Sequence, residues 1–417
     1  NKPTRSADDM LRGHLMYKSL VKANPKSEKA LVGLANTYTM LEDMDNSFVY
    51  INKALRINPR YRDAYILKGT NYRLKQDLKL AISSYETAVQ IDPKCTMAYL
   101  SLAVLYELNG DAKLGMEKYT TAYQLEPKNT EVIYALAYAK DRIQMRSLSG
   151  PKAKDKPADP IIVHPDVRKM LLTAKAYAEG GRALAVFSSI LLEKEHYHPD
   201  AKVRQESGEM LSFLTPIVKA FLTDNGWTAT SSCLQVFGGH GFIKEWGMEQ
   251  YVRDARINMI YEGTNTIQSL DLLGRKVLGN NGATLKKFGK LVAQLIEQEG
   301  VNEDMAEFIN PIAYLGDKMT KFTTEIGFKG FQNPDEVGAA AVDYLRVAGH
   351  LVMGYFWARM AQVALREIAN GNTDPFYAAK LQTARFYFAR LFPETASLML
   401  TARTGSKNLM DTDLALA

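Results

Sequence analysis

The 417-residue sequence is poor in cysteine and in histidine clusters, which limits the kinds of site it can hold. Its two cysteines, Cys95 and Cys233, are too few for a disulfide framework and lack the spacing of a metal site. His196 and His198 have no cysteine or carboxylate pattern around them that would complete a metal site. We therefore predict a cytoplasmic protein without a bound metal.

Long hydrophobic runs and long runs of one charge are also missing. No segment is apolar over enough residues to cross a bilayer, so we predict no membrane span. The net charge of +6 comes from interspersed Lys and Arg, and no nucleic-acid-binding module is recognisable. The chain begins at Asn1 without Met, so we expect a trimmed or processed piece.

No series of alternating polar and apolar residues indicates a β-sheet, whereas helical spacing of apolar residues recurs through the chain. We therefore predict an all-α fold, long enough for two or three domains. Thr215 and Pro216 predict a helix start, and Asp224-Asn225-Gly226 predicts a helix break. One final helix is expected over residues 385–410.

What the sequence does contain is an internal repeat of 34 residues in its first third. The recurring positions are Pro25, Pro59, Pro93 and Pro127, then Tyr38, Tyr72 and Tyr106, then Ala54, Ala88 and Ala122, with turns at Glu42-Asp43, Gln76-Asp77 and Gly110-Asp111. This is the tetratricopeptide period, with a small residue where paired helices touch and a proline closing each unit. We predict a half repeat before Pro25, three full repeats to about Lys128, and the first helix of a fourth.

Such helix pairs stack into a superhelix whose concave surface usually binds a protein or peptide. We therefore expect a protein or peptide partner in the groove of the repeats. Asn36, Asn71 and Arg73 are candidates for that surface.

A second group of motifs begins with Gln235-Val-Phe-Gly-Gly-His-Gly-Phe242 and ends with Ile260-Tyr-Glu-Gly-Thr-Asn-Thr266. Gly238 and Gly239 let the backbone approach a flat or anionic ligand, because no Cβ intervenes. Gly263 can adopt a conformation closed to other residues and so aim the Glu262 carboxylate into a cleft. In this order and spacing, the motifs resemble the C-terminal domain of the flavin-dependent acyl-CoA dehydrogenases.

The resemblance implies a catalytic role for Glu262. In that family, such a Glu removes the α-proton of an acyl-CoA thioester while the β-hydrogen leaves as hydride to flavin adenine dinucleotide (FAD). Thr264 and Thr266 would lie near the flavin, although Thr266 stands where the family commonly has Gln. The implied substrate is an acyl-CoA.

The resemblance also implies a cofactor contribution from two further segments. Gln235, Gly238 and Gly239 match the stretch that approaches the FAD of a partner subunit. Arg142 would meet the pyrophosphate, and Gln144 would lie close to the flavin of a neighbouring subunit. We therefore expect a homo-oligomer formed through the helical bundle.

The predicted domains follow from the repeats and the resemblance. Residues 1–134 form a tetratricopeptide superhelix, which continues through a shared helix into an acyl-CoA dehydrogenase-like bundle over residues 135–283. Residues 284–417 form an extra C-terminal helical domain, similar to that of a longer bacterial subgroup of the family.

Two functions remain open at this point. One is a dehydrogenase-like flavoprotein fused to a protein-binding repeat module; the other is a non-catalytic, all-helical assembly scaffold. The family's N-terminal helical domain and middle β-domain have no counterpart in these 417 residues, so we expect the activity of this exact chain to be vestigial or absent. The junction is compatible with a natural fusion, an engineered one or a composite chain.

Overall fold

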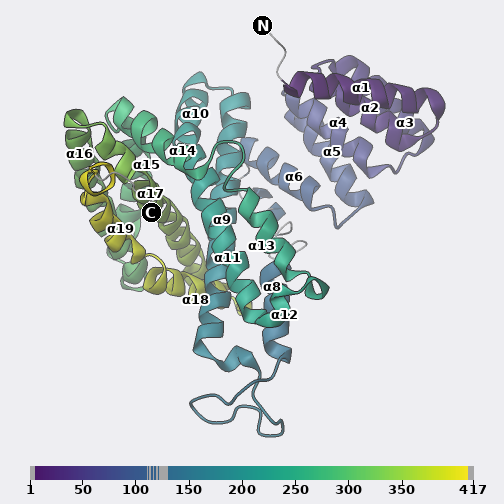
Figure 1. The fold of residues 1–417 in the computed structure, drawn as a ribbon. Coiled ribbons are helices and arrows are strands. Elements are labelled where there is room, and N and C mark those ends of the chain that lie inside the picture. The colour runs from purple at the N-terminus through teal and green to yellow at the C-terminus, as the bar shows by residue number, and fades with distance from the viewer. Residues whose placement is uncertain are drawn as a thin grey trace. The chain divides into compact units, whose positions relative to one another are not determined.

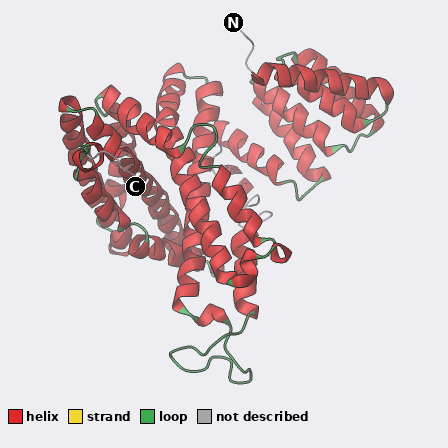
Figure 2. Cartoon of the chain, in the orientation of Figure 1, coloured by secondary structure: helices red, strands yellow, loops and turns green. Residues whose placement is uncertain are grey.

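The computed structural model describes residues 5–109, 111, 114, 115, 117, 118, 121 and 130–411. Every named element in that part of the chain is helical (Figures 1 and 2). The extended pairing found there is limited to an isolated antiparallel bridge between Ile143 and Pro160. The predicted all-α fold is therefore confirmed.

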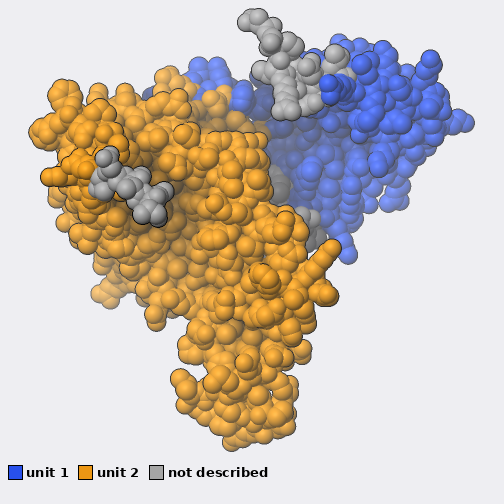
Figure 3. All heavy atoms as spheres, in the orientation of Figure 1, with its two compact units in different colours: residues 1–128, 196–204 blue, residues 129–195, 205–417 orange. Residues whose placement is uncertain are grey.

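The chain divides into two compact units, coloured separately in Figure 3. The first comprises residues 1–128 with 196–204, and the second comprises residues 129–195 with 205–417. The boundary predicted at residue 134 falls inside the second unit, and so does the one predicted at residue 283.

The first unit is built from antiparallel helix pairs. Its helices are α1 (Arg5–Ala23), α2 (Glu28–Met40), α3 (Met44–Ile57), α4 (Arg62–Leu74), α5 (Leu78–Ile91) and α6 (Thr96–Leu108). The turn inside each pair repeats the same chemistry, because Asp43, Asp77 and Asp111 each accept a hydrogen bond from the backbone N–H three residues later. Ala54 and Ala88 are fully buried, as expected for the small residue at a helix contact.

One of the predicted groove residues is part of the core of the repeats. Asn71 is fully buried, and its amide contacts the Thr39 hydroxyl at 2.8 Å and the Ser47 hydroxyl at 2.7 Å. The prediction that Asn71 faces the groove is therefore wrong, because its side chain satisfies two buried hydroxyls of the preceding repeat instead. Asn36 is exposed.

The second unit contains the remaining helices. They are α8 (Thr130–Asp141), α9 (Pro165–Tyr197), α10 (Ala201–Pro216), the π-helical turn η2 (Ile217–Phe221), α11 (Leu222–Phe237), α12 (Gly239–Phe242), α13 (Met248–Ile257), α14 (Asn265–Leu270), the π-helical turn η4 (Asp271–Val277), α15 (Ala283–Glu299), α16 (Ala306–Gln332), α17 (Asp335–Ala369), α18 (Pro375–Arg390), α19 (Glu394–Arg403) and α20 (Lys407–Met410), with short 3-10 turns at Ile161–Val163, Lys244–Trp246, Leu278–Asn280 and Glu303–Met305.

Two apolar clusters stabilise this unit. The larger surrounds α17, where Tyr344 and Trp357 are fully buried, and it includes residues of α9, α10, η2 and α15 to α19. The smaller joins α8, α9 and α11 through residues such as Ala135, Leu171 and Cys233. The smaller cluster is the one that holds the candidate site.

Several predicted helix ends are wrong. Pro216 does not start a helix, because the chain stays helical through α10, η2 and α11. Proline lacks the backbone N–H that would donate to the carbonyl four residues earlier, and the wider π-helical turn accommodates the missing hydrogen bond. Asn225 and Gly226 lie inside α11 without a break, since packing outweighs their weak helix propensity. The final helix is interrupted between α18 and α19, where Pro393 lacks the N–H that a continuous helix requires.

Candidate active site

A cavity of about 600 Å³ opens where the end of α8, the start of α9 and the end of α11 meet. Five of the predicted cofactor residues line it: Arg142, Gln144, Gln235, Gly238 and Gly239. The first two follow α8, while the other three end α11 and begin α12, so segments far apart in the sequence form one wall. Arg142, Gln144 and Gln235 are exposed to solvent there.

Gly238, Gly239 and Gly241, at and near the start of α12, are glycine for different structural reasons. A Cβ on Gly241 would lie 2.5 Å from the Leu234 carbonyl oxygen, so packing within the protein requires glycine. A Cβ on Gly238 or Gly239 would meet no atom of the described chain within 4 Å. Gly238 also has φ 57° and ψ −139°, a backbone conformation that strongly favours glycine. The backbone at Gly238 and Gly239 is therefore open to close approach by a ligand.

An aromatic stack supports the same wall. The Tyr138 hydroxyl lies 2.9 Å from His240 Nδ1, and the Tyr138 ring stacks on Phe237 with centroids 4.2 Å apart. The His240 ring stacks on Trp246 at 4.8 Å. Tyr138 was not singled out in the sequence, although it lies four residues before Arg142, whose N–H donates to the Tyr138 carbonyl at 2.8 Å at the end of α8.

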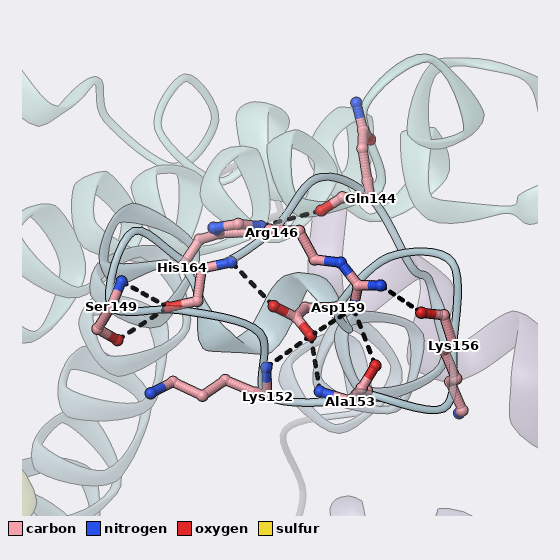
Figure 4. Close-up of polar contacts among 9 residues, drawn as sticks. Gln144, Arg146, Ser149, Lys152, Ala153, Lys156, Asp159 and His164 are labelled. Atoms are coloured by element: carbon pink, nitrogen blue, oxygen red, sulfur yellow. Dashed lines mark hydrogen bonds and ion pairs between the residues drawn. The ribbon is translucent and has the colours of Figure 1, made fainter.

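A buried carboxylate organises the loop that follows Gln144 (Figure 4). The Asp159 carboxylate is fully buried and accepts hydrogen bonds from the backbone N–H groups of Ser147, Lys152 and Ala153 at 2.9, 2.8 and 2.7 Å. The Arg146 guanidinium adds an ion pair at 3.2 Å. The hydrogen bonds from Ala153 and Ser147 contribute most to holding the pKa of Asp159 well below its usual range.

This loop in turn fixes the backbone of the cavity wall. The Gln144 N–H donates to the Asp159 carbonyl at 2.9 Å, and the Ile161 N–H donates to the Arg142 carbonyl at 2.8 Å. The His164 ring donates to the Gln144 carbonyl at 3.0 Å. Asp159 was missed in the sequence, because a single Asp in a loop rich in Pro and Lys carries no spacing that marks it as a hydrogen-bond centre.

The remaining predicted site residues lie in a second place, on the turn between α13 and α14 and in the first turn of α14. Gly263 has φ 88° and Glu262 has φ 55°, so two consecutive residues are left-handed. The Glu262 side chain is exposed, and so is Thr266. The Thr264 hydroxyl accepts a hydrogen bond from the Ile267 N–H at 3.5 Å and so forms the N-cap of α14.

The structure does not bring the two groups of residues together. The cavity residue Gln235 belongs to the last turn of α11, whereas the Glu262 turn is tied to its first turn by a hydrogen bond of 2.6 Å from Asn265 to Asp224. Sixteen residues of α-helix correspond to about 24 Å. Figure 1 accordingly shows α12 and α14 at opposite ends of α11. The chain thus presents two separate loci.

No group of three or more His, Cys, Asp or Glu side chains in the described part of the chain is arranged to hold a metal ion. Among the helices that the structure describes, none combines the length and the apolar character needed to cross a membrane.

Three protein families match the chain. Residues 135–278 match "Acyl-CoA dehydrogenase, C-terminal domain", and residues 286–413 match "Acetyl-CoA dehydrogenase C-terminal like". Residues 28–61 and 63–95 match the tetratricopeptide repeat. The two repeats matched lie within the three that the sequence predicts.

Three curated proteins similar to this chain are named as CoA dehydrogenases. The 3-methylmercaptopropionyl-CoA dehydrogenase of Ruegeria pomeroyi is 38% identical over 63% of this chain and 44% of its own length. The broad-specificity linear acyl-CoA dehydrogenase FadE5 of Mycobacterium tuberculosis is 29% identical over 67% of this chain and 48% of its own. A butyryl-CoA dehydrogenase of Syntrophomonas wolfei is 30% identical over 66% and 45%. The chain therefore spans less than half the length of these relatives.

A solved structure shares the fold. The Caenorhabditis elegans protein ACDH-11, in complex with C11-CoA, aligns over 81% of this chain and 49% of its own with a TM-score of 0.53. Sequence identity is 15%, so this likeness concerns the fold alone.

Proposed function

We propose that this chain, in which residues 135–413 carry the two C-terminal domains of the acyl-CoA dehydrogenase family behind tetratricopeptide repeats, is the helical part of a flavin-dependent acyl-CoA dehydrogenase. The observation that supports this proposal most directly is a shared cavity. It is lined by Arg142 and Gln144 together with Gln235, Gly238 and Gly239. The family resemblance had assigned all five to the cofactor.

The chemistry of the cavity fits part of an FAD molecule. No described residue forms an ion pair with Arg142, so its planar guanidinium is available to a pyrophosphate. The open backbone at Gly238 and Gly239 leaves room for close approach of the ligand, and a volume of about 600 Å³ lies within the range of small-molecule sites. When bound, FAD supplies the acceptor for the hydride that leaves the β-carbon.

Glu262 is proposed as the base that takes the α-proton of the acyl-CoA. A carboxylate can do this when it lies within hydrogen-bond reach of the proton and water is kept away. The left-handed turn at Glu262 and Gly263 projects the carboxylate from the end of α13. Since the side chain is exposed in the described chain, the substrate, the cofactor and a neighbouring protein surface must provide the walls around it.

The separation of the two loci supports a homo-oligomer. We infer that each chain provides Glu262 to one active site and its Arg142 cavity to the FAD of another, so that a second copy completes each site. The tetratricopeptide unit is proposed to bind a protein or peptide partner through its concave surface, and the exposed Asn36 is a candidate residue for that surface.

The visible absorption spectrum of the purified protein tests this function. FAD is added first, followed by butyryl-CoA, and the flavin band is expected to bleach only slowly as the flavin is reduced, because this chain spans less than half the length of the relatives it matches. The Glu262→Gln variant should still bind FAD but should not bleach. A protein that takes up no FAD, or one whose Glu262→Gln variant bleaches at the wild-type rate, would contradict the proposal.

A further inference from the structure

The turn that carries Glu262 is anchored by the residue three positions later. The Asn265 N–H donates to the Met259 carbonyl at 3.2 Å and so closes the turn. Two consecutive left-handed residues, one of them not glycine, cost free energy unless the surroundings hold them. The side chain of Asn265 provides most of the hydrogen bonds that connect this turn to the rest of the unit.

All hydrogen bonds of the Asn265 amide go to η2 and the first turn of α11. Its NH₂ group donates to the Ala220 carbonyl at 3.2 Å, to the Thr223 hydroxyl at 3.0 Å and to Asp224 Oδ1 at 2.6 Å. Its carbonyl oxygen accepts from Lys219 Nζ at 2.8 Å. The amide is thus held from both sides, and its orientation follows from its partners.

The π-helical turn that supplies these partners is itself fixed in the core. Phe221 is fully buried, and a Cβ on Gly349 of α17 would lie 2.4 Å from its ring. The His350 ring packs edge-on against Phe221 with centroids 5.0 Å apart. An irregular turn seated so closely on α17 has little freedom to move, and π-helical turns are often found at functional sites.

The charges near the turn are arranged around Lys219. Burial lowers the pKa of the Lys219 ammonium, and the carboxylates of Asp224 and Glu262 oppose this shift, so Lys219 and Glu262 interact through their charges. The other charged groups on the elements packed here are Asp224 of α11, Arg256 of α13, Asp343 and Arg346 of α17, with Glu394 paired to Arg346, and Asp271 paired to Arg275 in η4.

We propose that Asn265 is a positioning residue for the Glu262 carboxylate, because its side chain connects the turn that carries Glu262 to η2 and the first turn of α11. This inference rests on the proposed role of Glu262, and it adds a device that sets the position of that group. If Asn265 served only the overall stability of the unit, Asn265→Ala would change the unit as a whole and not the Glu262 turn in particular.

The proposal is tested by amide hydrogen exchange in Asn265→Ala. Exchange at Gly263 and Thr264 should become about tenfold faster or more, while exchange in α17 should stay unchanged. Gln250→Ala removes an exposed amide from α13 and is the matched control, for which no change in the turn is expected. Unchanged exchange in Asn265→Ala would overturn the positioning role.

These measurements need neither FAD nor acyl-CoA, so they can fail separately from the proposed function. Where the protein reduces flavin, Asn265→Ala should slow bleaching about tenfold while FAD binding stays as in wild type, because the cavity lies at the other end of α11. Bleaching at the wild-type rate in Asn265→Ala would overturn the inference and leave the proposed function intact.

Discussion

Asp159 and Asn265 each hold a turn of the second unit through several hydrogen bonds to one side chain. Asp159 collects backbone N–H groups around its carboxylate, and Asn265 connects the Glu262 turn to η2. Neither residue is proposed to contact a ligand. Both fix the backbone of a segment that carries a proposed site residue, Gln144 in one case and Glu262 in the other.

Replacing Asp159 with Asn should loosen the loop after Gln144, because an amide accepts fewer of the N–H donors that a carboxylate binds. We expect FAD binding to weaken by about tenfold. Because the folded-state pKa of Asp159 is lowered, its contribution to stability should be complete above about pH 4 and should be lost as pH falls through the lowered pKa. Thermal unfolding followed against pH checks this, since wild type and Asp159→Asn should converge at the lowest pH.

A buried ion pair offers a second prediction at this scale. Lys380 Nζ of α18 lies 2.7 Å from Glu179 Oε2 of α9, and both side chains are less than a tenth exposed. Glu179→Ala should lower the free energy of unfolding by about 3 kcal/mol, because it leaves the Lys380 charge buried without its carboxylate. Urea unfolding measures this, and a loss below about 1 kcal/mol would contradict a desolvated pair.

At the scale of elements, the packing of η2 on α17 is one of the contacts that connect the C-terminal helices with the Glu262 turn. Gly349→Ala should destabilise the protein by about 1–3 kcal/mol, because its Cβ would meet the Phe221 ring at 2.4 Å. Gly338→Ala is the matched control in the same helix, since its Cβ would meet no described atom within 4 Å and alanine favours the helix. Chemical unfolding of both variants checks the difference in sign.

The helical repeats could be predicted because their signal is periodic and local. Pro, Tyr and Ala at 34-residue intervals and the capping Asp43 and Asp77 all act on their own helix pair. The continuity of the helix at Pro216 and Gly226 could not be predicted, because it depends on packing between segments distant in the sequence, such as Phe221 of η2 against Gly349 of α17. Asn265 was missed for the same reason, because its partner Lys219 lies 46 residues away and no local pattern connects the two.

At the scale of the whole chain, the structure brings some of the predicted site residues together and leaves others apart. Arg142, Gln144, Gln235, Gly238 and Gly239 line one cavity, while Glu262 lies at the opposite end of α11. The spacing of the motifs in the sequence does not predict this separation, because the separation results from the packing of α11 and α13 side by side. The central claim is therefore that one chain divides its contributions between two active sites.

Mixed oligomers of Glu262→Gln and Arg142→Ala chains test that claim most directly. Each variant alone should have little flavin-dependent dehydrogenase activity. Co-expressed dimers should regain about a quarter of the wild-type activity, because half are mixed and each mixed dimer has one intact Glu262 facing one intact cavity. If the mixture stays as inactive as the separate variants while mixed dimers form, both loci belong to the same site and the account is contradicted.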